Sequence, residues 1–242
     1  MENKHAVVTG ASTGIGKAIA IELGKKGATV ILVARRKDKL EETKKLIGDI
    51  GGKAVVFEAD LSDINSINSL IQSIIKSTNS VDILINVAGI WHDKDEVFAG
   101  VDFDKFNQKT IIDTFTVGLL APILLAHGLA SNMPQGANII NISGTFENGA
   151  KGWLPYYVSK RGMEDLTLGL SQELKGKQIN INCISPSDTA TEEYIKYFPE
   201  DAVDANKPED IANEVVNLIN SNETGKFVVI KNGNLISEGF HK

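Results

Sequence analysis

Short apolar runs of strand length alternate with segments of helical apolar spacing along almost the whole chain. The strand-like runs are apolar at consecutive positions, as in ATVILVA at residues 28–34. A strand that is apolar on both faces is typical of a parallel sheet covered by helices on both sides. The alternation therefore predicts an α/β fold with a doubly wound parallel sheet.

The expected elements cover the whole chain. Seven strands are expected, at residues 5–9, 28–34, 53–59, 81–89, 138–143, 181–187 and 226–233. Helices are expected at residues 17–27, 37–51, 64–78, about 104–130, 156–175 and 208–220. Neither an internal repeat nor a Pro- or Ser-rich linker interrupts the pattern, so the sequence predicts one domain over residues 1–242.

Charge and composition narrow the classes of partner. Twenty-five Lys and Arg residues against thirty-one Asp and Glu residues leave a formal net charge of −6. Nucleic-acid binding needs an excess of positive charge to displace counterions, so we expect no nucleic-acid partner. No continuous apolar run approaches the roughly 18 residues of a membrane span, and the charged N-terminus enters a strand at once. We therefore expect a cytoplasmic protein without a signal peptide or membrane segment.

Cysteine and histidine usage predicts neither a disulfide nor a metal site. The single cysteine, Cys183, lies in an apolar strand-like run, where a buried and unreactive thiol is expected. His5, His92, His127 and His241 are scattered without the spacing of metal ligands. We expect no catalytic metal.

A glycine-rich loop joins the first strand to the first helix. Its sequence, Gly-Ala-Ser-Thr-Gly-Ile-Gly at residues 10–16, has the spacing G-x-x-x-G-x-G rather than the G-x-G-x-x-G of the standard dinucleotide fingerprint. Glycines let the backbone turn sharply and let a pyrophosphate approach the helix N-terminus, where free N–H groups and the helix dipole favour anions. The strand-loop-helix context predicts a dinucleotide site.

The end of the second strand indicates which dinucleotide binds. An Asp or Glu at this position hydrogen-bonds the adenosine ribose 2′-hydroxyl and repels a 2′-phosphate. This chain has Ala34, Arg35 and Arg36 instead. Guanidinium groups suit a phosphate by their charge and by their forked donors, although both arginines could also be merely solvated after the strand. We expect NADPH in preference to NADH.

Four motifs, in order along the chain, resemble those of the short-chain dehydrogenase/reductase family, whose fold is Rossmann-like. They are TGASTGIG at 9–16, Asp60-Leu61, Asn86-Val-Ala-Gly89 and Tyr156-Tyr-Val-Ser-Lys160. The resemblance covers essentially the whole chain. It implies that Asp60 binds the adenine amino group and that the strip at 86–89 backs the adenosine ribose, although the family usually has a second Asn at Val87.

The resemblance also implies a role for the segment after the sixth strand. Thr191 matches the threonine that contacts the nicotinamide end of the cofactor, although Ser187 replaces the usual Gly. The residues expected to bind the cofactor are Gly10, Ser12, Thr13, Gly14, Ile15, Gly16, Arg35, Arg36, Asp60, Leu61, Asn86, Ala88, Gly89, Tyr156, Lys160, Pro186, Thr189 and Thr191.

Tyr156 and Lys160 are four residues apart and therefore share one face of a helix. A phenol with a pKa of about 10 exchanges protons poorly at neutral pH. A nearby ammonium, and the positive nicotinamide of the oxidised cofactor, favour the phenolate and lower that pKa. We expect Tyr156 to give a proton to a carbonyl oxygen as hydride arrives at carbon, and Lys160 to hold the nicotinamide ribose as well.

The family's catalytic serine, which hydrogen-bonds the substrate oxygen, has two candidate positions here. The family usually places it thirteen residues before the tyrosine, which gives Ser143. Counting from the fifth strand instead gives Gly144, with a loop that is one residue shorter. Thr145 is a possible substitute. We predict that Ser143 supplies the catalytic hydroxyl.

A second departure lies in the helix around 104–130. There the family commonly has an Asn whose backbone carbonyl anchors an ordered water that links the lysine to solvent. Aligning Val117-Gly118-Leu119 on the family's V-N-L pattern places Gly118 at this position. A glycine keeps the carbonyl, but it destabilises a helix by about 1 kcal/mol relative to Ala. Either a slower proton relay survives through the carbonyl or water, or the helix opens locally at Gly118.

The resemblance implies an NADPH-dependent carbonyl reductase whose substrate is a 3-oxoacyl thioester or another small ketone, aldehyde or sugar. Trp91 and Trp153 fall where the family builds its substrate pocket, with packing in the core or at the rim as the alternative. Residues 188–208 correspond to the family's mobile lid, whose aromatic residues could equally form a subunit contact. Members are usually dimers or tetramers, so we expect a homodimer or homotetramer packed through the helices at 104–130 and 156–175. The alternative is an NADP(H)-binding sensor or scaffold with reduced or lost catalysis.

Overall fold

The computed structural model of the protein describes residues 1–93, 97–146 and 150–240. Its strands are β1 (His5–Thr9), β2 (Thr29–Ala34), β3 (Lys53–Glu58), β4 (Ile83–Asn86), β5 (Asn138–Ile142), β6 (Asn180–Pro186), β7 (Phe227–Lys231) and β8 (Asn234–Glu238). Across the described residues they form one eight-stranded sheet in the order β3-β2-β1-β4-β5-β6-β7-β8. All neighbours pair in parallel except β7 and β8, so the predicted doubly wound fold is confirmed.

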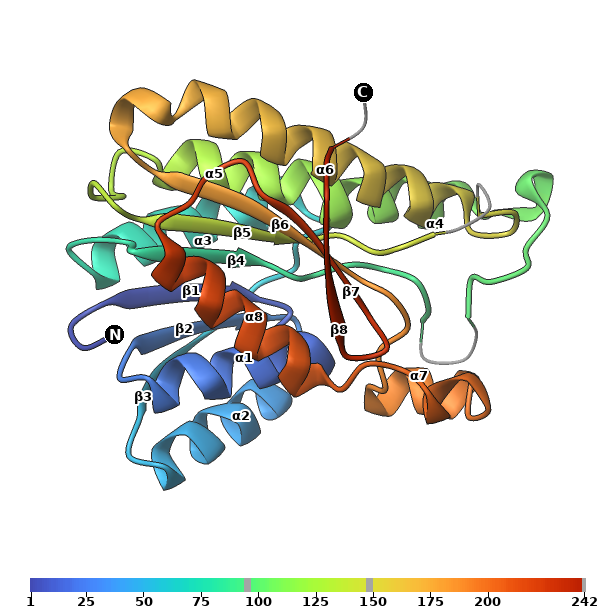
Figure 1. Ribbon diagram of the computed structural model, residues 1–242, viewed down its shortest axis with the longest axis horizontal. Helices are drawn as coiled ribbons and strands as arrows, with labels where there is room; N and C mark the ends of the chain where they lie inside the picture. Colours follow the sequence, from blue (N-terminus) through green and yellow to red (C-terminus); the bar gives the residue numbers. More distant parts are fainter. Residues whose placement is uncertain (94–96, 147–149, 241–242) are drawn as a thin grey trace.

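Helices cover both faces of this sheet (Figure 1). They are α1 (Gly14–Lys25), α2 (Lys37–Asp49), α3 (Ile64–Ser77), α4 (Gln108–Phe115), α5 (Ala121–Leu129), α6 (Leu154–Glu173), α7 (Glu192–Tyr197) and α8 (Pro208–Ser221). One apolar core lies between the sheet and α1, α2 and α8, and a second lies between the sheet and α3, α5 and α6. Val7 enters the second core whereas its neighbours Ala6 and Val8 enter the first, which is why the strands are apolar at consecutive positions.

The strand order reverses beside β1. From β1 the chain moves outward to β2 and β3 and then returns to the other side of β1 as β4. In open α/β sheets, ligands bind in the crevice beyond the carboxyl ends of the strands at such a reversal. The topology therefore predicts a binding site beyond the carboxyl ends of β1 and β4.

The helical stretch from Gln108 to Leu129 opens at Gly118, as one of the two alternatives predicted. A π-helical turn, Thr116–Leu120, separates α4 from α5 and contains the glycine. A β-carbon on Gly118 would lie 2.8 Å from the Ser159 hydroxyl of α6, so the glycine permits the close approach of these helices. π-Turns of this kind are frequent at functional sites.

The same stretch is more apolar than expected, since no run of membrane-spanning length was predicted. Among the described residues, Gln108–Leu129 is the one helical stretch that is long and apolar enough to cross a membrane, and 44% of its most apolar window is buried inside the protein. Its buried residues belong to the core shared with α3 and α6, with Val117, Ala121, Leu125, Ala126 and Leu129 among them. Burial in the protein core explains the composition, and one such helix is weak support for a membrane span.

The eighth strand was not predicted. β8 follows β7 through a tight turn in which Asn232 and Gly233 have φ of 50° and 71°. Two successive residues with positive φ are typical of the Asn-Gly turns that join antiparallel strands. β8 therefore adds an antiparallel edge to the seven expected parallel strands.

Candidate active site

A cleft of about 1040 Å³ opens at the carboxyl ends of β1 to β6. All the predicted cofactor-binding and catalytic residues line it, with one exception. The exception is Asn86, which is 2% exposed and whose amide Nδ2 donates to Asn141 Oδ1 at 2.8 Å. Asn86 thus lies beneath the cleft surface, where its side chain joins β4 to β5.

The glycine-rich loop has the geometry of an anion site. Gly10 adopts φ +67°, and a β-carbon on Gly16 would lie 2.3 Å from the Gly10 carbonyl oxygen, so neither position accepts a larger residue without rearrangement. The N-cap residue of α1, Thr13, makes no side-chain hydrogen bond to the helix N-terminus. Backbone N–H groups at the start of α1 therefore stay available to a phosphate.

Arginines and an aspartate line one end of the cleft, which the carboxyl ends of β2 and β3 form. Arg36 Nη2 donates to Thr13 Oγ1 at 3.3 Å, which places its guanidinium beside the glycine-rich loop. Burial alone would raise the pKa of Asp60, but hydrogen bonds from Ser62 and the charge of Arg35 hold it below its usual value. Asp60 is therefore an ionised acceptor, and the two guanidinium groups supply positive charge for a phosphate.

Tyr156 and Lys160 lie together at the other end of the cleft, on the first turns of α6. The Lys160 ammonium lies 5.3 Å from the centroid of the Tyr156 ring and donates to the Ile142 carbonyl at 2.8 Å. Gly89 gives them room, because a β-carbon there would lie 3.4 Å from the Tyr156 ring and 3.5 Å from Lys160 Nζ. The predicted pair is thus assembled from α6, β5 and the loop after β4.

Burial dominates the protonation of this pair. Lys160 is 2% exposed, and burial lowers its pKa to about 8 although the Glu164 carboxylate acts in the opposite direction. Burial raises the pKa of Tyr156 above its ordinary value. This differs from the expected lowering, because the Lys160 ammonium donates to a backbone carbonyl rather than to the phenol. At neutral pH the phenol of the free protein holds its proton, as a proton donor requires.

The structure does not bring the Ser143 hydroxyl to Tyr156. Ser143 Oγ donates to Glu164 Oε1 at 2.6 Å and lies 3.2 Å from the Lys160 carbonyl oxygen, so it faces α6. Thr145, the possible substitute, directs its hydroxyl to the Ser185 carbonyl. A β-carbon on Gly144 would lie 3.8 Å from Lys160 Cγ, so both positions lie against Lys160, Ser143 at its carbonyl and Gly144 at its side chain. The hydroxyl predicted to contact the substrate is thus hydrogen-bonded to α6 in this structure.

Glu164 is a site residue that sequence reasoning missed. It is 1% exposed and also accepts from Arg161 Nη1 at 2.8 Å. Its hydrogen bond from Ser143 ties α6 to the end of β5, and the next residue back, Ile142, accepts the Lys160 ammonium. Glu164 follows Lys160 by four residues, so its place on the same helical face was the signal available in the sequence.

This geometry predicts a mild effect for Ser143→Ala. We expect kcat to fall by less than about tenfold and the free energy of unfolding to fall by about 1–3 kcal/mol, because Glu164 loses one buried hydrogen-bond partner. Steady-state kinetics and denaturant unfolding measure the two quantities. A loss of about 10²-fold or more in kcat with unchanged stability would instead indicate that the Ser143 hydroxyl hydrogen-bonds the substrate oxygen during the reaction.

A buried amide anchors the cleft from the side of β7. Asn206 is fully buried, and its Nδ2 lies 3.1 Å from the carbonyl oxygens of both Asp188 and Ile230. Its Oδ1 accepts from the backbone of Gly233 at 2.8 Å. The loop that carries Thr189 and the N-cap of α7 is therefore held to the hairpin of β7 and β8.

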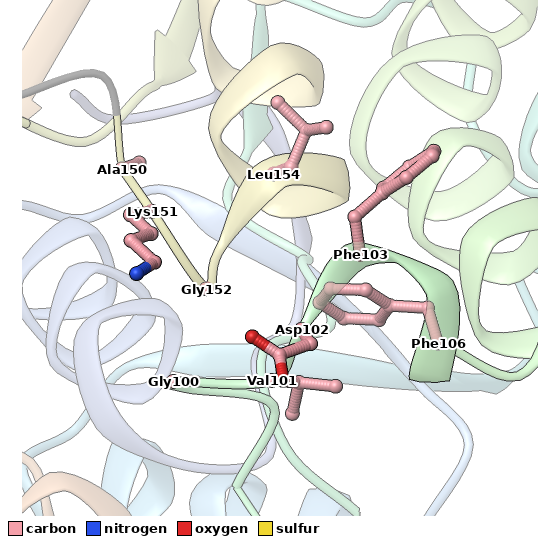
Figure 2. Close-up of a pocket in the computed structure, with 9 residues that line it drawn as sticks. All are labelled: Gly100, Val101, Asp102, Phe103, Phe106, Ala150, Lys151, Gly152 and Leu154. Carbon is pink, nitrogen blue, oxygen red and sulfur yellow. The ribbon is translucent and has the colours of Figure 1, made fainter.

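A smaller hollow of about 520 Å³ lies apart from this site. Figure 2 shows it between the turn at Gly152 and the phenylalanines at the entry to α4. Among the described residues its lining includes neither Tyr156 nor Lys160, and it consists of Gly100, Val101, Asp102, Phe103, Phe106, Ala150, Lys151, Gly152 and Leu154.

The arrangement of potential metal ligands and of the cysteine can be stated for the described part of the chain. Within residues 1–93, 97–146 and 150–240, no group of three or more His, Cys, Asp or Glu side chains is placed to hold a metal ion. Cys183 is buried in β6, and burial raises the pKa of its thiol, as expected for an unreactive cysteine. His241 lies outside the described residues.

Known proteins share this architecture. The family model described as short chain dehydrogenase matches residues 4–201. A fatty acyl-CoA reductase of Acinetobacter baylyi is 36% identical over 207 residues, which are 82% of this chain and 68% of that protein. A metagenomic short-chain oxidoreductase in complex with NADP has a TM-score of 0.77 and 30% identity, over 90% of this chain and 91% of that one. LugOII, a promiscuous reductase that catalyses keto-reduction at C1 in lugdunomycin biosynthesis, has a TM-score of 0.84 and 27% identity, over 94% and 96%.

Proposed function

Because the chain belongs to the short-chain dehydrogenase/reductase family and is an NAD(P)-dependent oxidoreductase, we propose that it reduces a carbonyl group with NADPH. The observation that carries the proposal is the Tyr156 phenol in the cleft beside the buried Lys160 ammonium, at the opposite end of one cleft from Arg35 and Arg36. The NADP bound to a similar structure agrees with the phosphate-binding chemistry of the arginines. A similar protein named as a keto-reducing enzyme agrees with the direction.

The residues of the chain divide the work along the cleft. The glycine-rich loop and the N-terminus of α1 hold the pyrophosphate, and Arg35 and Arg36 hold the 2′-phosphate. NADPH supplies the hydride. Tyr156 donates its phenolic proton to the carbonyl oxygen, and the Lys160 ammonium stabilises the phenolate that remains. Thr191, at the N-cap of α7, packs against Gly14 of the glycine-rich loop.

The lowered pKa of Lys160 predicts how the reduction depends on pH. Lys160 carries its charge below about pH 8 and loses it as the pH rises, whereas the raised pKa of Tyr156 keeps the phenol protonated. We therefore expect kcat/KM for NADPH, which reports the free protein, to fall above about pH 8 by up to about tenfold per pH unit. Lys160→Arg, which stays charged, should move the decline to higher pH. A profile that stays flat well above pH 9 would contradict this assignment.

The experiment that tests the proposed reaction is the oxidation of NADPH by purified protein with a panel of carbonyl compounds. The panel contains ketones, aldehydes, a sugar and a 3-oxoacyl thioester, and the alcohol product is identified by mass spectrometry. Turnover of any member with NADPH supports the proposal. Tight NADPH binding without turnover of any member would overturn it.

The geometry also favours a second candidate, an NADP(H)-binding protein with reduced or lost catalysis. The observation is that Ser143 faces Glu164 while Gly144 occupies the position beside Lys160. In this structure the Ser143 hydroxyl is therefore engaged by α6 and not by Tyr156, although Ser143 lines the cleft. Against this candidate, Tyr156 and Lys160 are both in place. The turnover experiment separates the two candidates.

We propose that the protein is a homodimer or homotetramer assembled through α4, α5 and α6. Each of these helices exposes an apolar side chain, namely Ile112, Ile123 and Val158, at 55%, 37% and 40%. A second copy would remove this apolar surface from water. Light scattering of the protein eluting from a size-exclusion column measures the mass directly, and a monomer at micromolar concentration would contradict the proposal.

A further inference from the structure

Building on the proposed carbonyl reduction, we infer that the substrate is a flat aromatic carbonyl compound without negative charge. The inference rests on a cluster of rings that surrounds Tyr156 and on the charges beside it. We call this cluster the aromatic wall, and it consists of Trp91, Phe146, Trp153, Tyr194 and Phe198, all of which line the cleft.

The aromatic wall begins at the reacting phenol. The ring centroids of Phe146 and Trp153 lie 5.9 and 6.2 Å from that of Tyr156. A carbonyl group that accepts the Tyr156 proton must therefore carry its substituents against these two rings. Both rings belong to the connection between β5 and α6, which leads directly into the helix that carries Tyr156.

The wall continues away from Tyr156 through three more rings. Trp153 lies 6.5 Å from Trp91 and 6.1 Å from Phe198, and Phe198 lies 5.1 Å from Tyr194. Aromatic rings attract one another in tilted and edge-to-face arrangements at centroid separations of about 4.5–7 Å. All of these contacts fall in that range. A flat ring of the substrate would make further ring–ring contacts of this geometry and would also bury apolar surface. A flexible acyl chain would be stabilised by the burial of apolar surface alone.

Acidic side chains surround the outer part of the wall. Among the described residues, the cleft lining there includes the carboxylates of Asp188, Glu193 and Asp201 and the ammonium of Lys196. Asp188 interacts with the Tyr194 hydroxyl, which places its carboxylate against the wall itself. Negative charge at this position repels carboxylates and phosphates. The inference therefore excludes acyl thioesters of phosphate-bearing carriers and favours neutral or cationic aromatic ketones and aldehydes.

The chain carries its own probe of this surface. It has two tryptophans, Trp91 and Trp153, and both belong to the aromatic wall. Intrinsic tryptophan fluorescence consequently reports on the wall alone. A ligand that stacks there must perturb this emission, and a ligand that binds elsewhere leaves it unchanged.

The test compares matched ketones on the protein saturated with NADP⁺, so that binding is measured without turnover. The probes are 2-acetylnaphthalene, its saturated counterpart 2-acetyldecahydronaphthalene, and the anion 6-acetyl-2-naphthoate, each titrated by calorimetry. We expect the aromatic ketone to bind about 3- to 10-fold more tightly than the saturated one. We expect the naphthoate to bind about 10-fold more weakly than 2-acetylnaphthalene. At saturation the change in tryptophan emission should be larger with 2-acetylnaphthalene than with the saturated ketone.

Variants assign any preference to the wall. Trp153→Leu should reduce the aromatic advantage to less than about twofold, and Trp153→Phe should retain most of it. Trp91→Leu is a second variant, should the first fail to fold. Phe103→Leu is the matched control, because Phe103 lies in the smaller hollow of Figure 2 and not in the cleft. It should leave the ratio unchanged.

The outcomes for the substrate class and for the reaction are separate. Equal or tighter binding of the saturated ketone or of the naphthoate overturns the substrate class, whether or not NADPH is oxidised. The expected order of binding without any turnover supports the substrate class and overturns the proposed reduction. Turnover of all three ketones at similar kcat/KM, with similar affinities, retains the reduction and overturns the substrate class.

Discussion

Tyr156→Phe is expected to lower kcat for ketone reduction by about 10²–10⁴-fold while NADPH affinity changes by less than about threefold. The substitution removes one oxygen atom and keeps the ring, so the contacts with Phe146 and Trp153 persist. The phenol is also the group from which the carbonyl oxygen is proposed to take its proton. Stopped-flow or steady-state oxidation of NADPH measures kcat, and fluorescence titration measures cofactor affinity.

The neighbouring tyrosine provides a matched control. Tyr157 lies on the same turn of α6, but its ring contacts Arg161 and it does not line the cleft. Tyr157→Phe should therefore retain kcat within about twofold. If Tyr156→Phe were as active as the native protein, another group would have to donate the proton. If both variants lost activity equally, the effect would reflect damage to α6 rather than lost proton transfer.

The sheet could be predicted because each buried strand is apolar at consecutive positions, which only a doubly covered parallel sheet explains well. β8 escaped this test because it is an edge strand, and its residues Leu235 and Ile236 are exposed. The available signal was the Asn232-Gly233 pair, which favours a hairpin. The short helix α7 was missed for a related reason, since six residues carry too little periodicity to identify a helix.

The part of the cleft at the glycine-rich loop could also be predicted, because it depends on the backbone. Glycine spacing and the order strand-loop-helix determine where a phosphate can approach, and they are visible in the sequence. Side-chain direction at the end of β5 is not visible in this way. Ser143 and Gly144 follow β5 in a loop, where the direction of a side chain depends on its tertiary contacts. Ser143 therefore satisfied the count from Tyr156 and still faced Glu164.

Gly118 illustrates a partial success. The glycine could be recognised as a departure, and local opening of the helix was one of two predicted consequences. The reason for a glycine was not visible in the sequence, because it lies in the contact with Ser159 of α6. The position of the departure could therefore be predicted from the sequence, whereas its cause, a packing contact between two distant segments, could not.

Replacing both Arg35 and Arg36 by Ala is expected to weaken NADPH binding by about 100-fold or more while changing NADH binding by less than about threefold. A hydrogen bond to a charged group contributes about 1.5–3 kcal/mol, which corresponds to about 10- to 150-fold in affinity for each one lost. The two dinucleotides differ only in the 2′-phosphate, so the ratio of their dissociation constants isolates this contribution. Isothermal titration of each dinucleotide into each protein measures the ratio.

The salt dependence and a control on α2 make the test of the two arginines specific. Exposed charges lose their effect in salt, so the NADPH preference of the native protein should shrink as ionic strength rises and that of the double variant should not. Lys39→Ala removes a nearby positive charge that is already paired with Glu42 at 2.8 Å, and it should leave both affinities unchanged. If the native protein bound NADH as tightly as NADPH, the arginines would be solvated residues after β2. The glycine-rich loop, Tyr156 and Lys160 would then still describe a dinucleotide-dependent reductase, but one without selection for the 2′-phosphate.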